Sequence, residues 1–533
     1  MISPHITLPM DTQLQVISDL ASKTNFSNLD WGIVVIYLLG SIVIGWIGRS
    51  YVGNMTDFIG AGRSIGTRLG VASMAGTEMG LITVMYSAQK GFTGYFAAFH
   101  IAILAGLVAF FVGATGFIVA KLRSMEVLTI PEFYEKRFSK DVRILGGTLL
   151  VLGGVLNMGL FLKVGSMFIV GITGMSNESN ALMITMTVLI CLVLFYTVLG
   201  GMVSVVITDY IQFVVLSFGV LLTTWLCVNH LGWETIVTTI KNSQGENGFD
   251  PFKSSEFGWD YITWMVFLGL VNCAIWPTAI ARALMMKSTN AVKKQFMWSA
   301  IPFTIRQMIP IFWGICAYVF IVVQAPDLKE AFYPDPGGGV TASDNLFAMP
   351  VFLGRILPVG ILGLVSAAMI AAFMSTHDSY LLCWSSVITQ DIIAPLKGHL
   401  SQKSRILITR LTIVCLGVYV WLWGLFYKGS DDIWDYMAIT GAVYFSGAFA
   451  LLWGGLYWKK GSAMGARFSL IAGFFAVLGL GPVKEFIGMV NAEGDSIISS
   501  SMLGLIVIVA SSVLFVIGSL LFPDQKRHEV SES

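Results

Sequence analysis

Runs of about 20 mostly apolar residues recur along the whole chain, and each has the length of an α-helix that crosses the hydrocarbon core of a bilayer. Hydrophobic residues make up 56% of the 533 positions and charged residues only 12%, which is more apolar surface than a soluble core can bury. The sequence therefore predicts an all-α polytopic membrane protein with 13 transmembrane helices. We expect them at 30–49, 66–89, 92–120, 145–171, 180–199, 203–228, 261–281, 299–324, 356–390, 406–426, 434–457, 465–488 and 501–522.

Lys and Arg are unevenly distributed between the predicted loops. One side, which includes 121–143, 282–294 and 397–410, holds 22 of the 32 basic residues, and the other side holds five. Because cytoplasmic loops carry the excess of basic residues, we expect the N-terminus outside the cell and the C-terminus in the cytoplasm. The first 29 residues show no signal-peptide pattern, so we expect the first helix to target the chain to the cell membrane.

Several functional classes lack their usual sequence signals. The chain has no glycine-rich phosphate loop ending in GK[ST], no HExxH and no GxSxG, so neither a nucleotide-driven pump nor a membrane hydrolase is expected. The six cysteines form no CxxC pair, and the net charge of +1 does not indicate nucleic-acid binding. The long outer loops at 229–260 and 325–355, which include the run Pro-Asp-Pro-Gly-Gly-Gly at 334–339, are interpreted as lids or turns. An enzyme is not expected, and no obligatory protein partner is visible.

Two predicted helices are interrupted at corresponding places, five helices apart. The span 66–89 contains Gly76, Glu78 and Gly80, and the span 261–281 contains Asn272 and the pair Trp276-Pro277. Paired broken helices are the best sequence indication of a transporter's binding site, because broken backbone frees carbonyl and amide groups. Close helix packing by glycine and a simple proline kink are the alternative reading of each segment.

The most polar stretch at membrane depth is Ala-Ala-Phe-Met-Ser-Thr-His-Asp-Ser-Tyr at 371–380. On a helix, Ala372, Ser375, Thr376 and Ser379 lie on one face, beside the carboxylate of Asp378. Hydroxyl groups in membrane helices often only bond to their own carbonyls or join helices. With an ionisable residue added, an oxygen cluster that suits a hard cation such as sodium becomes the better interpretation.

Three other polar residues remain to be placed. Asp209 lies about six residues inside the predicted span 203–228, where it either stays hydrated or pairs with an incoming cation. Lys163 needs a partner or must extend to one end of its helix. His100 is a solute ligand, a proton carrier or, most commonly for a buried histidine, a core residue with satisfied hydrogen bonds.

At this point the motifs match a known family. The run Gly-Gly-Met-Val-Ser-Val-Val-Ile-Thr-Asp-Tyr-Ile-Gln at 200–212, the stretch 371–380, the segment 277–282 and the run Trp-Gly-Gly-Leu-Tyr-Trp-Lys-Lys-Gly at 453–461 resemble the sodium/solute symporter family. The resemblance extends over nearly the whole chain from about residue 30. It implies two inverted five-helix repeats of the LeuT type, at 66–228 and 261–457. Residues 1–65 would then hold the N-terminus and a first peripheral helix, 229–260 an external loop, and 458–533 two peripheral helices and a cytoplasmic tail.

The resemblance also implies site residues. A sodium ion, co-transported as the coupling ion, would be bound by main-chain oxygens of Gly76, Met79 and Ala372 and by the hydroxyls of Ser375 and Thr376. A register error of one residue would move the first two to Ala75 and Glu78. A possible second cation site comprises Asp209, Asp378 and Ser379, with Ser375 beside them, and two carboxylates there would need a cation between them or one proton. The candidate solute-binding residues are Glu78, Thr83, His100, Lys163, Asn272 and Trp276.

The function implied is sodium-coupled symport, in which a small polar organic solute is imported by alternating access. Amino-acid-like or carboxylate solutes are favoured over sugars because of Glu78 and Lys163. A proton-coupled or uncoupled carrier, with Glu78, His100 and Asp378 as proton sites, is one alternative. A membrane solute sensor with the same fold is another, and both differ from the main reading in whether uptake depends on external sodium.

Overall fold

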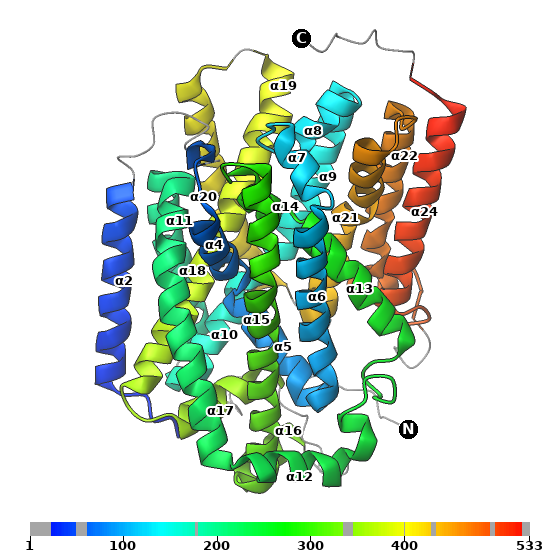
Figure 1. Cartoon of the computed structure of the whole chain (residues 1–533). Coiled ribbons are helices and arrows are strands. Elements are labelled where there is room, and N and C mark those ends of the chain that lie inside the picture. Colours follow the sequence, from blue (N-terminus) through cyan, green and yellow to red (C-terminus); the bar gives the residue numbers. More distant parts are fainter. Residues whose placement is uncertain are drawn as a thin grey trace.

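The computed structural model describes residues 23–48, 61–175, 180–333, 345–398, 400–427, 433–490 and 496–524. Within these ranges the regular secondary structure is helical apart from two isolated β-bridges, between Ile65 and Met286 and between Val490 and Ser496. Long helices lie side by side along one common direction, and shorter helices cover both ends of the bundle (Figure 1). The turn predicted at 334–339 and most of the C-terminal tail lie outside the described residues.

The first half of the chain contains these helices: α2 (Asn28–Gly48), α4 (Thr67–Glu78), α5 (Leu81–Gly94), α6 (Phe99–Thr115), α7 (Val119–Ser124), α8 (Ile130–Arg137), α9 (Lys140–Met158), α10 (Phe161–Thr173), α11 (Ala181–Leu231) and α12 (Trp233–Gln244). The second half contains α13 (Trp259–Ala274), α14 (Pro277–Leu284), α15 (Thr289–Val323), α16 (Pro326–Phe332), α17 (Ala348–Ile356), α18 (Ile361–Val387), α19 (Ala394–Lys397), α20 (Gln402–Phe426), α21 (Ile433–Tyr457), α22 (Ala463–Phe474), α23 (Gly481–Phe486) and α24 (Ser500–Leu521).

Both interruptions predicted from glycine and proline are present. The helix α4 ends at Glu78, and α5 begins at Leu81 after Met79 and Gly80, whose backbone is not helical. The second break separates α13 from α14, which begins with Pro277 at its first position, where a missing N–H costs no helical hydrogen bond. The two breaks are consequences of local sequence, which is why they were predictable.

Several predicted spans have internal breaks that the apolar pattern did not show. The span 145–171 is formed by α9 and α10, and the span 465–488 by α22, a short 3₁₀ segment and α23. The outer loops predicted as lids or turns also contain helices, namely α12 in 229–260 and α16 and α17 in 325–355. These short helices connect the long ones, and hydropathy over a window of about 20 residues does not detect elements of that length.

The helix α11 covers 51 residues, where two spans were predicted. A straight helix of that length would extend about 77 Å, more than twice the thickness of the hydrocarbon core. Tyr196 in the first third of α11 contacts Asp378. Asp209, which lies 13 positions later in the sequence, contacts Ser375 on the same part of α18. The two ends of α11 form separate candidate spans, Ala181–Val198 and Val205–Leu231, which correspond to the two spans predicted.

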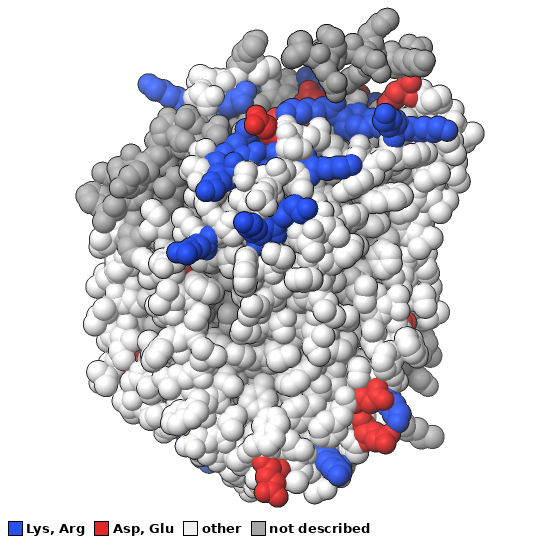
Figure 2. All heavy atoms as spheres, viewed as in Figure 1, with Lys and Arg blue, Asp and Glu red and all other residues white. Residues whose placement is uncertain are grey.

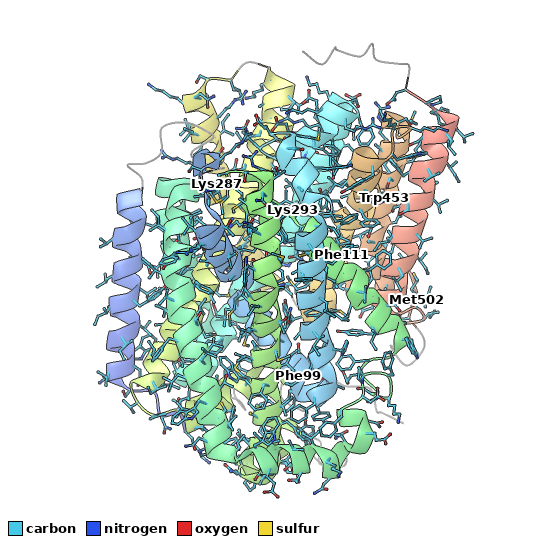
Figure 3. The ribbon with its side chains drawn as sticks, viewed as in Figure 1. Phe99, Phe111, Lys287, Lys293, Trp453 and Met502 are labelled. Carbon is cyan, nitrogen blue, oxygen red and sulfur yellow. The ribbon has the colours of Figure 1, made fainter. Side chains whose placement is uncertain are left out.

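The described residues contain ten stretches that are long and apolar enough to cross a membrane, together with shorter apolar helices at Asn28–Val43, Asn345–Ile356 and Ala463–Gly479. Large apolar side chains are exposed around the bundle, among them Phe111, Trp453 and Met502 (Figure 3). Lys and Arg gather at the end of the bundle where α7, α8 and α19 lie, and Lys287 and Lys293 belong to this end (Figures 2 and 3). An apolar belt with a basic end is typical of a membrane protein.

Candidate functional site

The break after α4 lies directly against the polar face of α18. The hydroxyl of Thr376 donates to the main-chain oxygen of Thr77 at 3.1 Å and to that of Ala372 at 3.0 Å. A methyl group at Gly80 would lie 2.3 Å from the Thr376 Oγ1 atom, so this close approach requires glycine. Carbonyl and hydroxyl oxygens therefore meet where the sequence predicted a sodium site.

The predicted ligands in α4 have different surroundings. Gly76 faces α11, because a Cβ at this position would lie 3.1 Å from the carbonyl oxygen of Asp209. Met79 occupies the break itself, and its amide donates to the carbonyl of Ala75. The main-chain oxygen that contacts Thr376 belongs to Thr77, one residue after Gly76.

A buried arginine lies at the predicted second cation site. The Nη2 atom of Arg282 donates to Thr77 Oγ1 at 2.7 Å and to Ser379 Oγ at 2.5 Å, and it lies 3.2 Å from Asp209 Oδ2. Ser73 and Thr77 also donate to Asp209 Oδ2, at 2.7 and 3.2 Å, and Ser375 donates to Oδ1. Arg282 was predicted in a cytoplasmic loop, and this prediction was wrong: the residue belongs to α14 and is 0% exposed. The guanidinium thus lies between hydroxyls and the carboxylate of Asp209, and no contact joins it to Asp378 among the described residues.

Asp378 completes this cluster. Its carboxylate accepts hydrogen bonds from Tyr196 at 2.9 Å and from Ser379 at 3.1 Å, and the structure gives it no ion pair among the described residues. Asp209 and Asp378 are both fully buried. With both carboxylates ionised, the cluster has two negative charges and one guanidinium, which leaves a formal charge of −1.

A cavity of about 90 Å³ lies between the two broken helices. Residues from α4, α5, α9, α10, α13, α15, α18 and α21 line it: Thr77, Glu78, Ile82, Thr83, Tyr86, Asn157, Phe161, Leu268, Asn272, Trp276, Arg306, Gln307, Thr376, Tyr380, Trp434, Met437, Ala438, Gly441 and Phe445. Eleven of these 19 residues are aromatic or apolar and eight are polar, a mixture that suits a small polar solute. Thr77 and Thr376 belong both to this lining and to the oxygen cluster, so the two regions adjoin.

One ion pair lies in the cavity wall. Arg306 of α15 donates from Nη1 to both the carboxylate and the main-chain oxygen of Glu78, each at 2.8 Å. Thr278, at the start of α14, donates to the other carboxylate oxygen of Glu78 at 3.2 Å. Glu78 is the last residue of α4, so this group joins the two broken helices. A carboxylate at the N-terminus of α14 is also stabilised by the helix dipole.

Four of the six predicted solute-binding residues line this cavity, namely Glu78, Thr83, Asn272 and Trp276. His100 lies elsewhere, with its ring against Phe257 and its Nδ1 atom 2.6 Å from the carbonyl of Ala97. Lys163 donates to the carbonyl of Tyr427 at 3.0 Å. Neither residue is part of the cavity lining, and their role in solute binding stays a prediction.

Arg282 and Arg306 were missed as site residues. Arg306 lies inside the predicted span 299–324, and an intramembrane arginine is by default a functional candidate, so a signal was present. Arg282 directly follows the predicted span 261–281 and looks like an ordinary interfacial cation. Only the fold brings it to Asp209.

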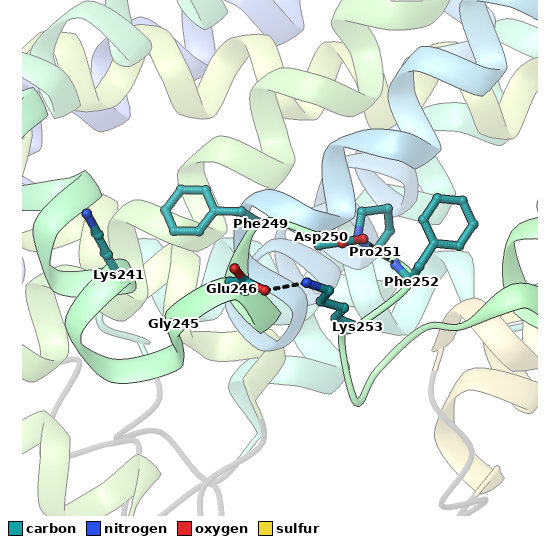
Figure 4. Close-up of a pocket in the computed structure, with 8 residues that line it drawn as sticks. All are labelled: Lys241, Gly245, Glu246, Phe249, Asp250, Pro251, Phe252 and Lys253. Carbon is teal, nitrogen blue, oxygen red and sulfur yellow. Dashed lines mark hydrogen bonds and ion pairs between the residues drawn. The ribbon is translucent and has the colours of Figure 1, made fainter.

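A second hollow, of about 610 Å³, lies on the loop after α12, at the end of the bundle opposite the basic cluster (Figures 1, 2 and 4). Its lining includes Phe249 and Phe252, and Glu246 is paired with Lys253 across it. It shares no lining residue with the cavity between the broken helices. An exposed ion pair on a loop contributes little binding energy, so the candidate site is the inner cavity.

The chain is similar to known membrane proteins over most of its length. The model of the family described as "Sodium:solute symporter family" matches residues 58–473. Sodium/proline symporter 2 of Staphylococcus saprophyticus is 23% identical over 501 residues, which are 89% of this chain and 91% of that protein. A sodium/glucose cotransporter of Vibrio parahaemolyticus is 25% identical over 473 residues, covering 84% and 85% of the two chains. The solved structure of a Na⁺-coupled sialic acid symporter, in a substrate-bound outward-open state, superimposes with a TM-score of 0.76 at 21% identity, covering 94% of this chain and all of that one. The predicted all-helical, multi-span transporter fold is thereby confirmed.

Proposed function

Since the chain belongs to the sodium:solute symporter family, we propose that it imports a small polar organic solute through the cavity between its broken helices, together with sodium bound beside it. As a member of this family, the chain is a sodium-coupled solute symporter of the membrane. It is a transporter and not an enzyme, as the sequence predicted. Sodium is then a co-transported substrate and no resident cofactor. The relatives named above are proline and glucose carriers, so their names do not select the solute.

The proposed sodium site comprises the main-chain oxygens at the end of α4, the carbonyl of Ala372 and the hydroxyls of Ser375 and Thr376. The observation that carries this proposal is the position of Thr376, whose hydroxyl lies within hydrogen-bond distance of carbonyl oxygens on both α4 and α18. Neutral oxygen ligands suit a cation that must bind and later leave. We propose Gly76 at the end of α4 and Met79 in the break that follows it, and the contact made by Thr77 supports a register within one residue of this.

The proposed mechanism is alternating access. Sodium would enter down its gradient, driven also by a membrane potential worth about 2.3 kcal/mol per charge per 100 mV. Its site would join α18 to the end of α4, while Glu78 joins α4 to α14 and to Arg306. Because sodium stabilises the arrangement that forms the cavity, sodium and solute would each favour the binding of the other.

A second cation is proposed at Asp209, Asp378 and Ser379. The guanidinium of Arg282 compensates the carboxylate of Asp209, and the carboxylate of Asp378 would be balanced by a further small cation or by one proton. A buried charge without a counter-charge is costly, so the cluster favours any cation that reaches it.

The proposed location is the cell membrane, with the N-terminus outside and the C-terminus in the cytoplasm. The concentration of Lys and Arg at one end of the bundle supports this orientation (Figure 2).

The test measures solute uptake by the reconstituted protein and the melting temperature of the purified protein, each with and without sodium. Both are measured for the wild type and for the Ser375→Ala/Thr376→Ala variant. We expect the melting temperature of the wild type to rise with sodium, because a ligand of the native state stabilises it. The double variant should lose both this rise and sodium-driven uptake. A sodium effect that is identical in the two proteins would refute the proposed site. Uptake that needs no sodium would favour the proton-coupled or uncoupled carrier.

A further inference from the structure

We infer that the transported solute is a small zwitterion of the α-amino-acid type, with its carboxylate on Arg306 and its ammonium group toward Glu78. This inference rests on the proposed transport through the cavity. Four features of the cavity carry it: the unused edge of Arg306, the charge balance of its wall, the acceptors for a cationic nitrogen, and its size.

Arg306 retains hydrogen-bonding capacity after its contact with Glu78. A guanidinium has five N–H donors, and the contacts of Arg306 with described residues use Nη1 alone. Its Nε atom is buried and has no acceptor in the described part of the chain. The ring of Phe303 lies 4.1 Å from the guanidinium carbon and packs against the guanidinium face. No described residue accepts from Nε or Nη2, and the edge that these two atoms form matches a carboxylate in bidentate fashion.

The charges of the cavity wall are balanced without solute. Glu78 and Arg306 form one pair, with side chains only 13% and 10% exposed. A solute with a single charge would add an unpaired charge at low dielectric, which is unfavourable. A zwitterion adds none, and it places each of its charges beside the opposite charge of the wall. When the side chains of the wall are considered alone, a zwitterion is favoured over a simple anion or a simple cation.

Acceptors and aromatic rings are available for a cationic nitrogen. Tyr86 and Trp434 lie edge to face with ring centroids 4.5 Å apart, and Trp276 donates to the hydroxyl of Tyr380 at 2.8 Å. All four rings line the cavity, and such rings stabilise a cation placed over their faces. Asn157 is 2% exposed, and its Oδ1 atom has no donor among the described residues. An acceptor of this kind requires N–H or O–H groups on the solute, which favours a primary or secondary ammonium over a quaternary one.

The size of the cavity limits the solute. Its volume of about 90 Å³ is small beside the 300–1,000 Å³ of pockets for drug-sized ligands. A solute with few heavy atoms fits, and an amino acid has its two charged groups on one carbon, within the span of an adjacent Glu and Arg.

The experiment measures charge movement on solid-supported membranes with reconstituted wild-type protein. The proteinogenic L-amino acids, glycine betaine, D-glucose and D-galactose are each applied with and without sodium. The amino acid with the largest signal is then compared with its deamino analogue, which keeps only the carboxylate, and with its decarboxy analogue, which keeps only the amine. We expect a sodium-dependent signal from at least one amino acid and an apparent affinity at least about 30-fold weaker for both analogues.

The outcomes separate the two proposals. A sodium-dependent signal from a sugar or a singly charged analogue, with none from amino acids, overturns the zwitterion inference and leaves sodium symport intact. A signal from glycine betaine alone contradicts the N–H requirement. An absence of any signal from amino acids likewise overturns the inference. A signal from amino acids that is the same without sodium supports the solute class and contradicts the proposed sodium coupling.

Variants test the residue roles. Arg306→Lys keeps the positive charge but lacks the paired N–H donors of the guanidinium edge. We therefore expect the affinity for the amino acid to fall while the sodium-dependent rise in melting temperature persists. The double variant Glu78→Gln/Arg306→Gln removes both charges, so the cavity wall stays neutral and the fold is not destabilised by an unpaired charge. We expect this variant to lose the preference for the zwitterion over its deamino analogue. Lys253→Gln, at an exposed ion pair on the outer loop, is the control and should behave as the wild type. An unchanged preference in the double variant would contradict the roles of both residues.

Discussion

Replacing Arg282 tests the charge count at the buried cluster. The distance of 3.2 Å between Arg282 Nη2 and Asp209 Oδ2 corresponds to an attraction of about 5 kcal/mol at an effective dielectric constant of about 20. Part of this attraction is offset by the cost of desolvating the two groups, and breaking a buried pair typically costs about 3–5 kcal/mol. Arg282→Gln leaves Asp209 and Asp378 together without the guanidinium, and the formal charge of the cluster changes from −1 to −2.

We therefore expect Arg282→Gln to melt at a lower temperature than the wild type at low sodium concentration. Sodium should raise its melting temperature more than that of the wild type, because a small cation can take over the role of the guanidinium. Asp209→Asn/Arg282→Gln restores the formal charge to −1 and should recover most of the lost stability. Asp378→Asn leaves the Asp209 and Arg282 pair balanced, so its stability should respond least to sodium at this cluster.

The assay is thermal unfolding of the purified proteins over a series of sodium concentrations, with choline replacing sodium at constant ionic strength. If Arg282→Gln melts like the wild type at low sodium, the guanidinium does not compensate the carboxylates. If the double variant is less stable than Arg282→Gln alone, the loss comes from packing and hydrogen bonds, and the charge argument is refuted.

Two further predictions concern other parts of the chain. Gly80→Ala places a methyl group 2.3 Å from Thr376 Oγ1, so we expect this variant to lose the sodium-dependent rise in melting temperature. Gly32→Ala is the control, because no neighbouring atom lies within 4 Å of the added methyl group, and it should keep this rise. An unchanged rise in Gly80→Ala would show that the break and α18 are not in contact. Asp327 is paired with Arg355 and Lys23, each at 2.9 Å, and the hydrogen bond from Arg355 lowers the pKa of its carboxyl below the ordinary value. Its stabilising contribution is therefore fully present above about pH 4 and is lost as the pH falls through the lowered pKa, so the difference in melting temperature between the wild type and Asp327→Asn should shrink on acidification.

The polar face of α18 and the two helix breaks could be predicted because their causes are local. Spacing along one helix decides that Ser375, Thr376 and Ser379 share a face, and glycine and proline interrupt a helix wherever the helix lies. The same reasoning did not detect the break between α9 and α10, whose apolar pattern continues through it. Hydropathy also assigned single spans where shorter helices follow one another.

The amino-acid sequence by itself determined that this chain crosses a membrane as a bundle of helices. It also determined which two helices are interrupted and which helix carries the oxygen-rich face. Only the tertiary structure decided which charges meet. Arg282 and Asp209 are 73 positions apart, and Arg306 and Glu78 are 228 positions apart. An ion pair forms only within about 4 Å, and that distance depends on how distant helices pack rather than on any spacing along one of them. The same arginine is a solvated interfacial cation in one packing and the counter-charge of a buried aspartate in another.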